Sequence, residues 1–225
     1  MSLRKPLVGG AAAALLFVSA GGNGRSLLAQ NSAMGQAEFY TAGTSSFTVP
    51  EGVARIRVFV YGAGGGAGGS ISNSQLGLNG GSGAFIEAVL DVTAGEKLSV
   101  VVGAGGKGGK EGTDGAGTAG GASQILNASK TVLVSAGGGG AGAGCSSCGS
   151  LSHVGAGGEP GTAPAGSLKH PGPDGTGCGG QQSRCGYTPP GLTADVDLGG
   201  RGFLNGNDND TETNSGISGY VYIEW

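Results

Sequence analysis

Residues 55–69 read RIRVFVYGAGGGAGG. In the first seven residues, Ile56, Val58 and Val60 fall on one side, and Arg55, Arg57, Phe59 and Tyr61 fall on the other. A period of two is typical of a β-strand with one buried face. Residues 62–69 then carry no side chain larger than a methyl group. The chain therefore passes directly from a half-buried strand into nearly bare backbone.

The same succession of strand and glycine run recurs along the chain. Further strands are predicted at 46–50, 84–92, 98–102, 123–126, 131–134 and 219–225, and glycine-rich runs follow at 103–121 and 137–144. Residues 127–130 are typical of a four-residue hairpin loop. Beyond the first twenty residues, no window shows the 3.6-residue period of an amphipathic helix. The sequence therefore predicts an all-β fold.

The composition excludes several classes of protein. Glycine accounts for 54 of 225 residues, several times its usual share of about 7%. Because there are only 8 prolines and no sustained Gly-X-Y repeat, a collagen helix is excluded. The net charge of −3 offers no broad basic surface to nucleic acid. The hydrophobic share of 37% is too high for a wholly disordered chain.

The amino terminus has the layout of a secretory signal peptide. Arg4 and Lys5 precede the apolar run 7–20, which ends in the small residues Val-Ser-Ala. We expect cleavage after residue 20, with a cut after residue 29 or an organelle transit peptide as alternatives. Residues 21–36 then form a flexible lead, and residues 37–225 a single domain. No other stretch is long and apolar enough to span a membrane, so the sequence predicts a secreted or cell-surface protein.

The four cysteines lie in a segment at about 145–190 that is rich in Cys, Pro and Ser. They are Cys145, Cys148, Cys178 and Cys185. Because a secretory leader directs the chain to an oxidising compartment, we expect disulfides, in any of three pairings. A zinc site and free or redox-active thiols are the alternatives.

Few residues suggest other chemistry. Asn127 and Asn209 head Asn-X-Ser/Thr sequons, which are glycosylation candidates in a eukaryotic host. The two histidines, His153 and His170, lie among Gly, Pro and Ser and are expected in loops. The sequence therefore identifies no catalytic residue, no cofactor and no metal site.

Several strand–glycine junctions resemble a known family. The stretches are 47–53 (FTVPEGV), 61–66 (YGAGGG), 101–106 (VVGAGG) and 134–140 (VSAGGGG). They resemble the glycine-rich domains of bacterial, phage-tail and environmental surface proteins. The extracellular glycine-rich region of anaplastic-lymphoma-kinase-type receptors shares the plan more distantly. The resemblance spans residues 37–225 and implies a jelly-roll-like β-sandwich whose glycine-rich loops pack as polyglycine-II helices. It also implies adhesion or structural roles without catalysis.

The sequence thus predicts a secreted, non-enzymatic adhesion, structural or surface-binding protein that uses its glycine-rich loops as the contact surface. The expected partner is an extracellular protein or a glycan surface, and the protein itself is a candidate oligomer. Two alternatives from other classes stay open. One is binding to ice or a mineral surface, and the other is a small disulfide-containing secreted enzyme or toxin.

Overall fold

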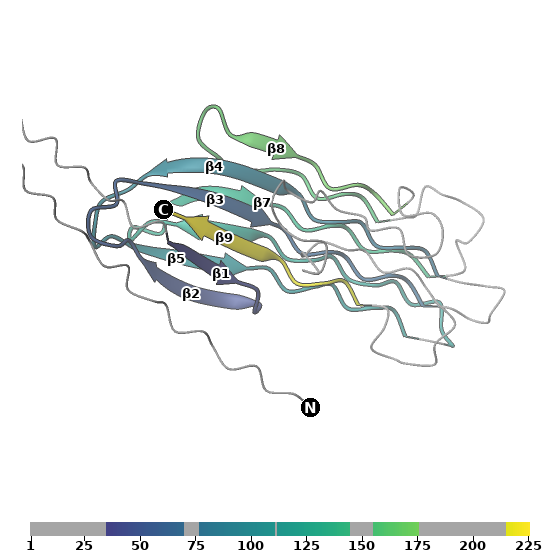
Figure 1. Ribbon diagram of the computed structural model, residues 1–225. Helices are drawn as coiled ribbons and strands as arrows, with labels where there is room; N and C mark the ends of the chain where they lie inside the picture. Colours follow the sequence, from purple (N-terminus) through teal and green to yellow (C-terminus); the bar gives the residue numbers. More distant parts are fainter. Residues whose placement is uncertain (1–34, 70–76, 111, 145–154, 176–214) are drawn as a thin grey trace, which may run out of the picture. The chain divides into compact units, whose positions relative to one another are not determined.

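The computed structural model describes residues 35–69, 77–110, 112–144, 155–175 and 215–225. The chain divides into two units, 1–31 and 32–225, and every described residue belongs to the second. These residues contain nine strands and no helix (Figure 1). The strands are β1 (Gln36–Phe39), β2 (Gly43–Thr48), β3 (Arg55–Tyr61), β4 (Phe85–Asp91), β5 (Lys97–Val102), β6 (Ser123–Leu126), β7 (Val132–Ala136), β8 (Leu168–His170) and β9 (Tyr220–Glu224). In the described part of the chain, no helix has the length and apolar character needed to cross a bilayer.

The strands form two antiparallel sheets. The five-stranded sheet has the order β1-β9-β3-β4-β8, and the four-stranded sheet the order β2-β5-β6-β7. The predicted hairpin is the β6–β7 pair, in which Ile125 lies opposite Val134. The prediction of an all-β sandwich is therefore confirmed, whereas its jelly-roll connectivity stays a prediction.

One hydrophobic core joins the two sheets. The five-stranded sheet contributes Ile56, Val58, Val60, Ile86, Val221 and Ile223, and the four-stranded sheet contributes Phe47, Leu98, Val100, Ile125 and Val134. Most of these side chains are fully buried. The period-two alternation predicts the inward face of β3 correctly, because successive side chains of a strand point to opposite faces. Burying this apolar surface is the main force that holds the sheets together.

Two strands were not predicted. β1 begins at Gln36, within the predicted flexible lead, and pairs with β9. β8 lies in the Cys/Pro/Ser-rich segment and pairs with β4. His170 therefore occupies a strand, and its expected place in a loop is wrong. β1 has four residues and β8 has three, which is too short for a pattern of side chains to identify a strand.

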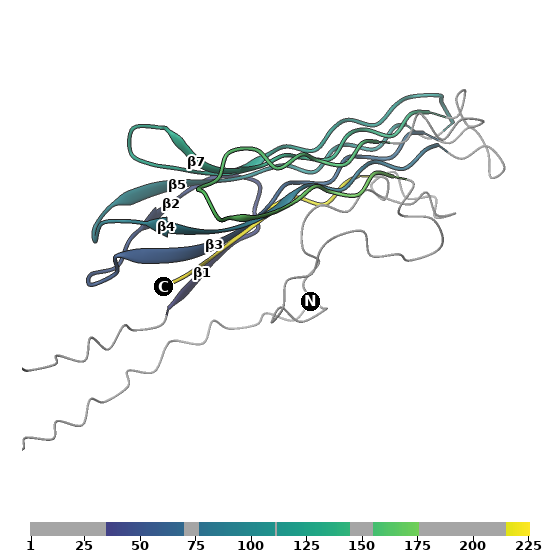
Figure 2. The same ribbon diagram turned by 90° about the horizontal axis from the view of Figure 1, so that it is seen from above.

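The glycine-rich segments continue the strands in two layers, and we call them together the glycine bundle (Figures 1 and 2). The front layer, which extends the five-stranded sheet, consists of 215–219, 62–69, 77–84 and 172–175. The back layer, which extends the four-stranded sheet, consists of 103–110, 115–121, 137–144 and 155–159. Packed sheets stand about 10 Å apart because side chains fill the space between them. Without side chains, the two layers approach until their backbones bond directly.

Candidate functional site

Segment 62–69 shows how the glycine bundle is bonded. Every third N–H donates to the same neighbour. Gly62, Gly65 and Gly68 donate to Ala84, Gly81 and Leu78 in the front layer, and Ala63, Gly66 and Gly69 donate to Gly121, Thr118 and Gly115 in the back layer, all at 2.7–3.0 Å. Gly64 donates to Ile217, while segments 103–110 and 137–144 donate back to 62–69. A single chain segment is thus bonded both within its layer and across the layers.

Glycine is required at the closest approaches of the bundle. A Cβ atom at Gly62, Gly65 or Gly68 would overlap the carbonyl oxygen of Gly137, Gly140 or Ala143 in the back layer. These three positions recur every third residue, as the hydrogen bonds do. Alanine occupies positions 63 and 67 of the same segment, where it is fully buried. The three glycines at 62, 65 and 68 therefore stand where the back layer leaves no room for a side chain.

Segments of the Cys/Pro/Ser-rich region also join the bundle. Gly155 and Gly158 donate to the carbonyl oxygens of Asn79 and Ser82, and Gly172 donates to that of Gly158. The polyglycine blocks quoted from the sequence therefore mark only part of the bundle. The signal that the sequence offered here was the spacing of single glycines within 155–175.

The described ends of the segments meet at the end of the bundle farthest from the strands. Hydrogen bonds join Gly69 to Gly115, Gly109 to Ala67 and Gly175 to Gly155. The described residues that flank 70–76, 145–154 and 176–214 in the sequence lie at this end. Cys145, Cys148, Cys178, Cys185 and Asn209 belong to these segments and lie outside the described residues, so the disulfide prediction stays a prediction.

Asn127 lies in the β6–β7 loop, as predicted. Its Oδ1 accepts the Thr131 N–H at 2.9 Å, and Lys130 closes the turn with a positive φ of 63°. This loop lies at the opposite end of the strands from the glycine bundle, since β6 leaves the bundle and β7 returns to it. Glycosylation of Asn127 stays a prediction.

The outer face of the five-stranded sheet is aromatic next to the bundle. One cross-strand row consists of Tyr220, Tyr61, Phe85 and His170. The ring centroids of Tyr61 and Phe85 are 4.6 Å apart, and His170 stacks on Phe85 at 6.1 Å. Tyr61 and Phe85 are only 3% and 2% exposed. The alternation of β3 predicted one buried face, but at this end of the strand both faces are buried.

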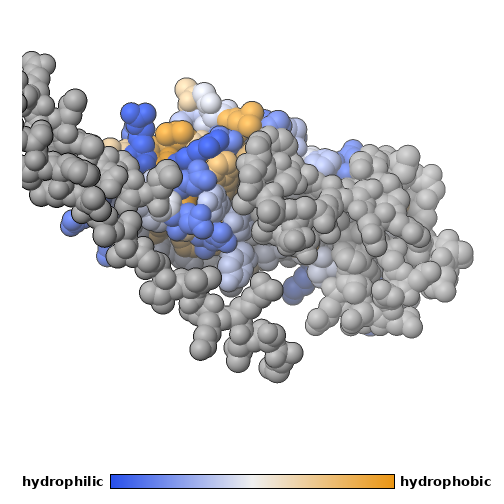
Figure 3. All heavy atoms as spheres, viewed as in Figure 1, coloured by the Kyte–Doolittle hydropathy of each residue, from blue (hydrophilic) through white to orange (hydrophobic). Residues whose placement is uncertain are grey.

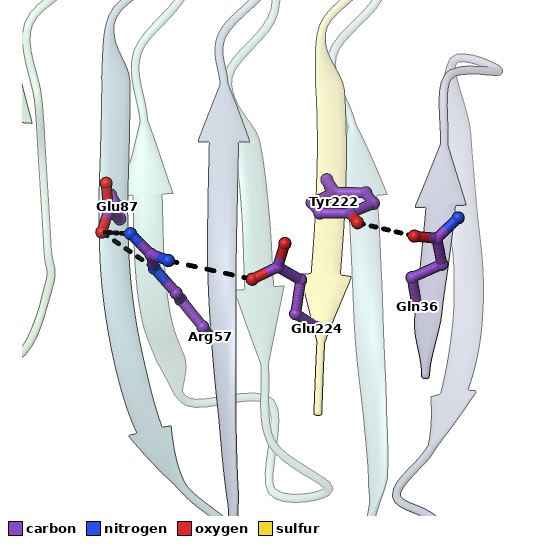
Figure 4. Close-up of polar contacts among 5 residues, drawn as sticks. All are labelled: Gln36, Arg57, Glu87, Tyr222 and Glu224. Carbon is purple, nitrogen blue, oxygen red and sulfur yellow. Dashed lines mark hydrogen bonds and ion pairs between the residues drawn. The ribbon is translucent and has the colours of Figure 1, made fainter. Parts of the chain in front are cut away.

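Farther from the bundle, the same face carries charged and polar side chains (Figures 3 and 4). Arg57 Nε and Nη2 donate to Glu87 Oε1 at 2.9 and 2.5 Å, and its Nη1 is 3.9 Å from Glu224 Oε2. The guanidinium also lies 4.9 Å from the centre of the Phe59 ring. Exposed ion pairs add little stability, so the effect of this network is to hold Arg57 in one orientation.

Two tyrosines of β9 hold their protons strongly. Burial raises the pKa of Tyr220, and the Glu38 carboxylate raises it further. Burial also raises the pKa of Tyr222, together with the charge of Glu224. The Tyr222 hydroxyl donates to Gln36 Oε1 at 2.8 Å (Figure 4). Both phenols are therefore neutral hydrogen-bond donors over the physiological range of pH.

With Tyr220→Phe, the free energy of unfolding is expected to fall less steeply as the pH rises above about 10. The folded chain keeps the Tyr220 proton at a pH where the unfolded chain, with a tyrosine pKa of about 10, releases it. The unfolded state is therefore favoured as the pH rises above about 10. Urea unfolding at a series of alkaline pH values measures the slope, and an absorbance titration of tyrosine reports the ionisation. Equal slopes for the parent and the variant would contradict the assignment.

Comparison with known proteins identifies the family of the chain. No curated protein matches the sequence. The model of one family, described as a glycine-rich domain, matches residues 40–225. This range includes β2 to β9 and every segment of the glycine bundle. The chain therefore belongs to the glycine-rich domain family.

Proposed function

We propose that this chain is a secreted, non-enzymatic adhesion or surface-binding protein. In this proposal the β-sandwich anchors the glycine bundle, and the bundle presents the segments at its far end to an extracellular partner. The observation that carries the proposal is the hydrogen bonding of the bundle within and across its two layers. Glycine loses more conformational freedom on ordering than any other residue. Segments that served only as flexible connections between strands would not need to be ordered at this entropic cost.

We further propose that the bundle segments are polyglycine-II helices. The support is the change of hydrogen-bond partner along 62–69, where the same neighbouring segment is contacted again at every third residue. Extended helices of the polyproline-II type have three residues per turn and no internal hydrogen bonds, which leaves every N–H free to bond to a neighbour. A bundle of this kind is a stiff support built without a hydrophobic core.

The end of the bundle farthest from the strands is the candidate contact surface. The described residues that flank 70–76, 145–154 and 176–214 lie there, and the sequences of these three segments are mostly polar. Binding residues are often carried by loops that a rigid scaffold positions. The predicted signal peptide supports a location of this surface outside the cell. Ice or mineral binding, and a secreted enzyme or toxin, stay predictions without support from a described residue.

Exchanging segment 70–76 for Gly and Ser residues of equal number is expected to weaken binding to the target surface by about tenfold or more, because a few contact residues carry most binding energy. The labelled full chain is titrated onto washed bacterial cells, insoluble chitin and cellulose. The control variant Ala128→Gly changes the β6–β7 loop at the opposite end, keeps the Asn127 sequon and should bind as the parent does. Absence of saturable binding to every surface, or an equal loss in the control, would overturn the proposal.

A further inference from the structure

An open hollow of about 670 Å³ lies on the outer face of the five-stranded sheet. It is at the end of the strands away from the glycine bundle, where β3 begins and β9 ends. The side chains that matter for its chemistry are those of Gln36, Arg55, Arg57, Val89, Tyr222 and Glu224. Sites for small ligands commonly have volumes of about 300–1,000 Å³ and combine apolar walls with a few placed polar groups.

The walls combine aromatic and hydrogen-bonding groups. Gln36, Glu224, Arg57 and Val89 are direct cross-strand neighbours on β1, β9, β3 and β4. Val89 is 53% exposed, which is unusual for an apolar side chain in this sheet. Trp225 borders the hollow, and its ring packs against Phe47 with centroids 5.4 Å apart.

The polar groups of the hollow are held in place before any ligand arrives (Figure 4). The Tyr222 hydroxyl donates to Gln36 Oε1, which fixes the amide of Gln36. Arg57 is held between Glu87 and Glu224. Groups that are already ordered on a sheet cost little further entropy when they bind a ligand.

The arginines and carboxylates around the hollow are all in ion pairs. Arg57 is paired with Glu87 and Glu224, and Arg55 lies 3.7 Å from Asp91. A strongly anionic or cationic ligand would have to displace one of these partners. A ligand that carries many neutral donors and acceptors uses both the guanidinium and the carboxylate groups without breaking a pair.

We propose that this hollow binds a neutral saccharide. The hydroxyl groups of a sugar match the mixed donors and acceptors of Gln36, Arg55 and Glu224, and the apolar face of its ring matches Tyr222 and Val89. The site is separate from the contact surface of the proposed function, because it lies at the other end of the strands. The result of the saccharide test therefore does not affect the proposed contact role of the glycine bundle.

The single tryptophan of the chain provides the measurement. The full chain is titrated with neutral hexasaccharides of glucose, mannose and N-acetylglucosamine, and with a hexasaccharide of galacturonic acid as the acidic arm. Binding of a neutral saccharide is expected to change the fluorescence of Trp225 saturably. Backbone amide shifts of Arg55, Val89 and Tyr222 should titrate with the same affinity.

Val89→Glu places a charge in the hollow and should lower the affinity by about tenfold or more. The matched control, Leu168→Glu, changes another exposed apolar residue of the same sheet that does not line the hollow and should leave the affinity unchanged. Three outcomes would overturn the proposal: no response to any neutral saccharide, tighter binding of the acidic hexasaccharide, or equal losses in the two variants. Urea unfolding checks that each variant keeps the fold.

Discussion

Gly65→Ala is expected to lower the free energy of unfolding by about 3 kcal/mol or more. The new methyl group would overlap the carbonyl oxygen of Gly140, which already accepts the Gly81 N–H at 2.9 Å. Because the obstacle is backbone, no change of rotamer relieves it. The front and back layers must separate locally, and the hydrogen bonds that cross between them lengthen or break.

Gly115→Ala is the matched control within the same bundle. A Cβ atom there would meet only the Thr113 hydroxyl oxygen at 3.3 Å and the backbone nitrogen of Lys110 at 3.7 Å. Alanine also restricts the unfolded chain, which is worth about 0.4–1 kcal/mol in favour of folding. We therefore expect the control to stay within about 1 kcal/mol of the parent. Urea unfolding followed by circular dichroism and Trp225 fluorescence gives both values, and a parent-like Gly65→Ala would refute the packing argument.

Backbone amides of the glycine bundle are expected to exchange with solvent at least about a thousandfold more slowly than in a random coil. Residues 103–121 are the decisive region, because a glycine-rich stretch of this length resembles a flexible linker in sequence. In the structure, Gly106 donates to Gly64, Gly109 to Ala67 and Gly120 to Gly139. Each of these amides is exposed to solvent only when the two segments that its hydrogen bond joins separate.

Hydrogen exchange followed by two-dimensional NMR resolves these amides one by one. Gly112, which lies in an exposed turn between two bundle segments, serves as the internal reference and should exchange fast. Random-coil rates at Gly106, Gly109 and Gly120 would show that the bundle is not a stable ordered unit. The rigid-support part of the proposed function would then fail, while the sandwich would be unaffected.

Alternating side chains made most of the sandwich predictable. The bounds of β3 agree with the sequence analysis, and β4, β5, β6 and β9 agree within about two residues, as is usual for element ends. Ile56, Val58 and Val60 face the core as expected. The turns at Gly52 and Gly95 both have φ near +80°, a conformation that few residues other than glycine adopt.

Other features left no local signal. β1 and β8 pair with the edges of longer strands beside them, and each is too short for its own side chains to identify a strand. The outer aromatic row depends on residues from β9, β3, β4 and β8, which are far apart in the sequence. The hollow bordered by Arg57 and Trp225 likewise arises from the register of neighbouring strands.

The sequence by itself determined most of the strands, the side of β3 that faces the core and where the chain has no side chains. Only the tertiary structure decided that Gly65 bonds to Gly81 and lies against Gly140. The reason is physical. A side chain carries its preference for water or for the core in its own chemistry, whereas every glycine N–H and C=O is alike. The partner of each is therefore chosen by the strands that deliver the segments side by side.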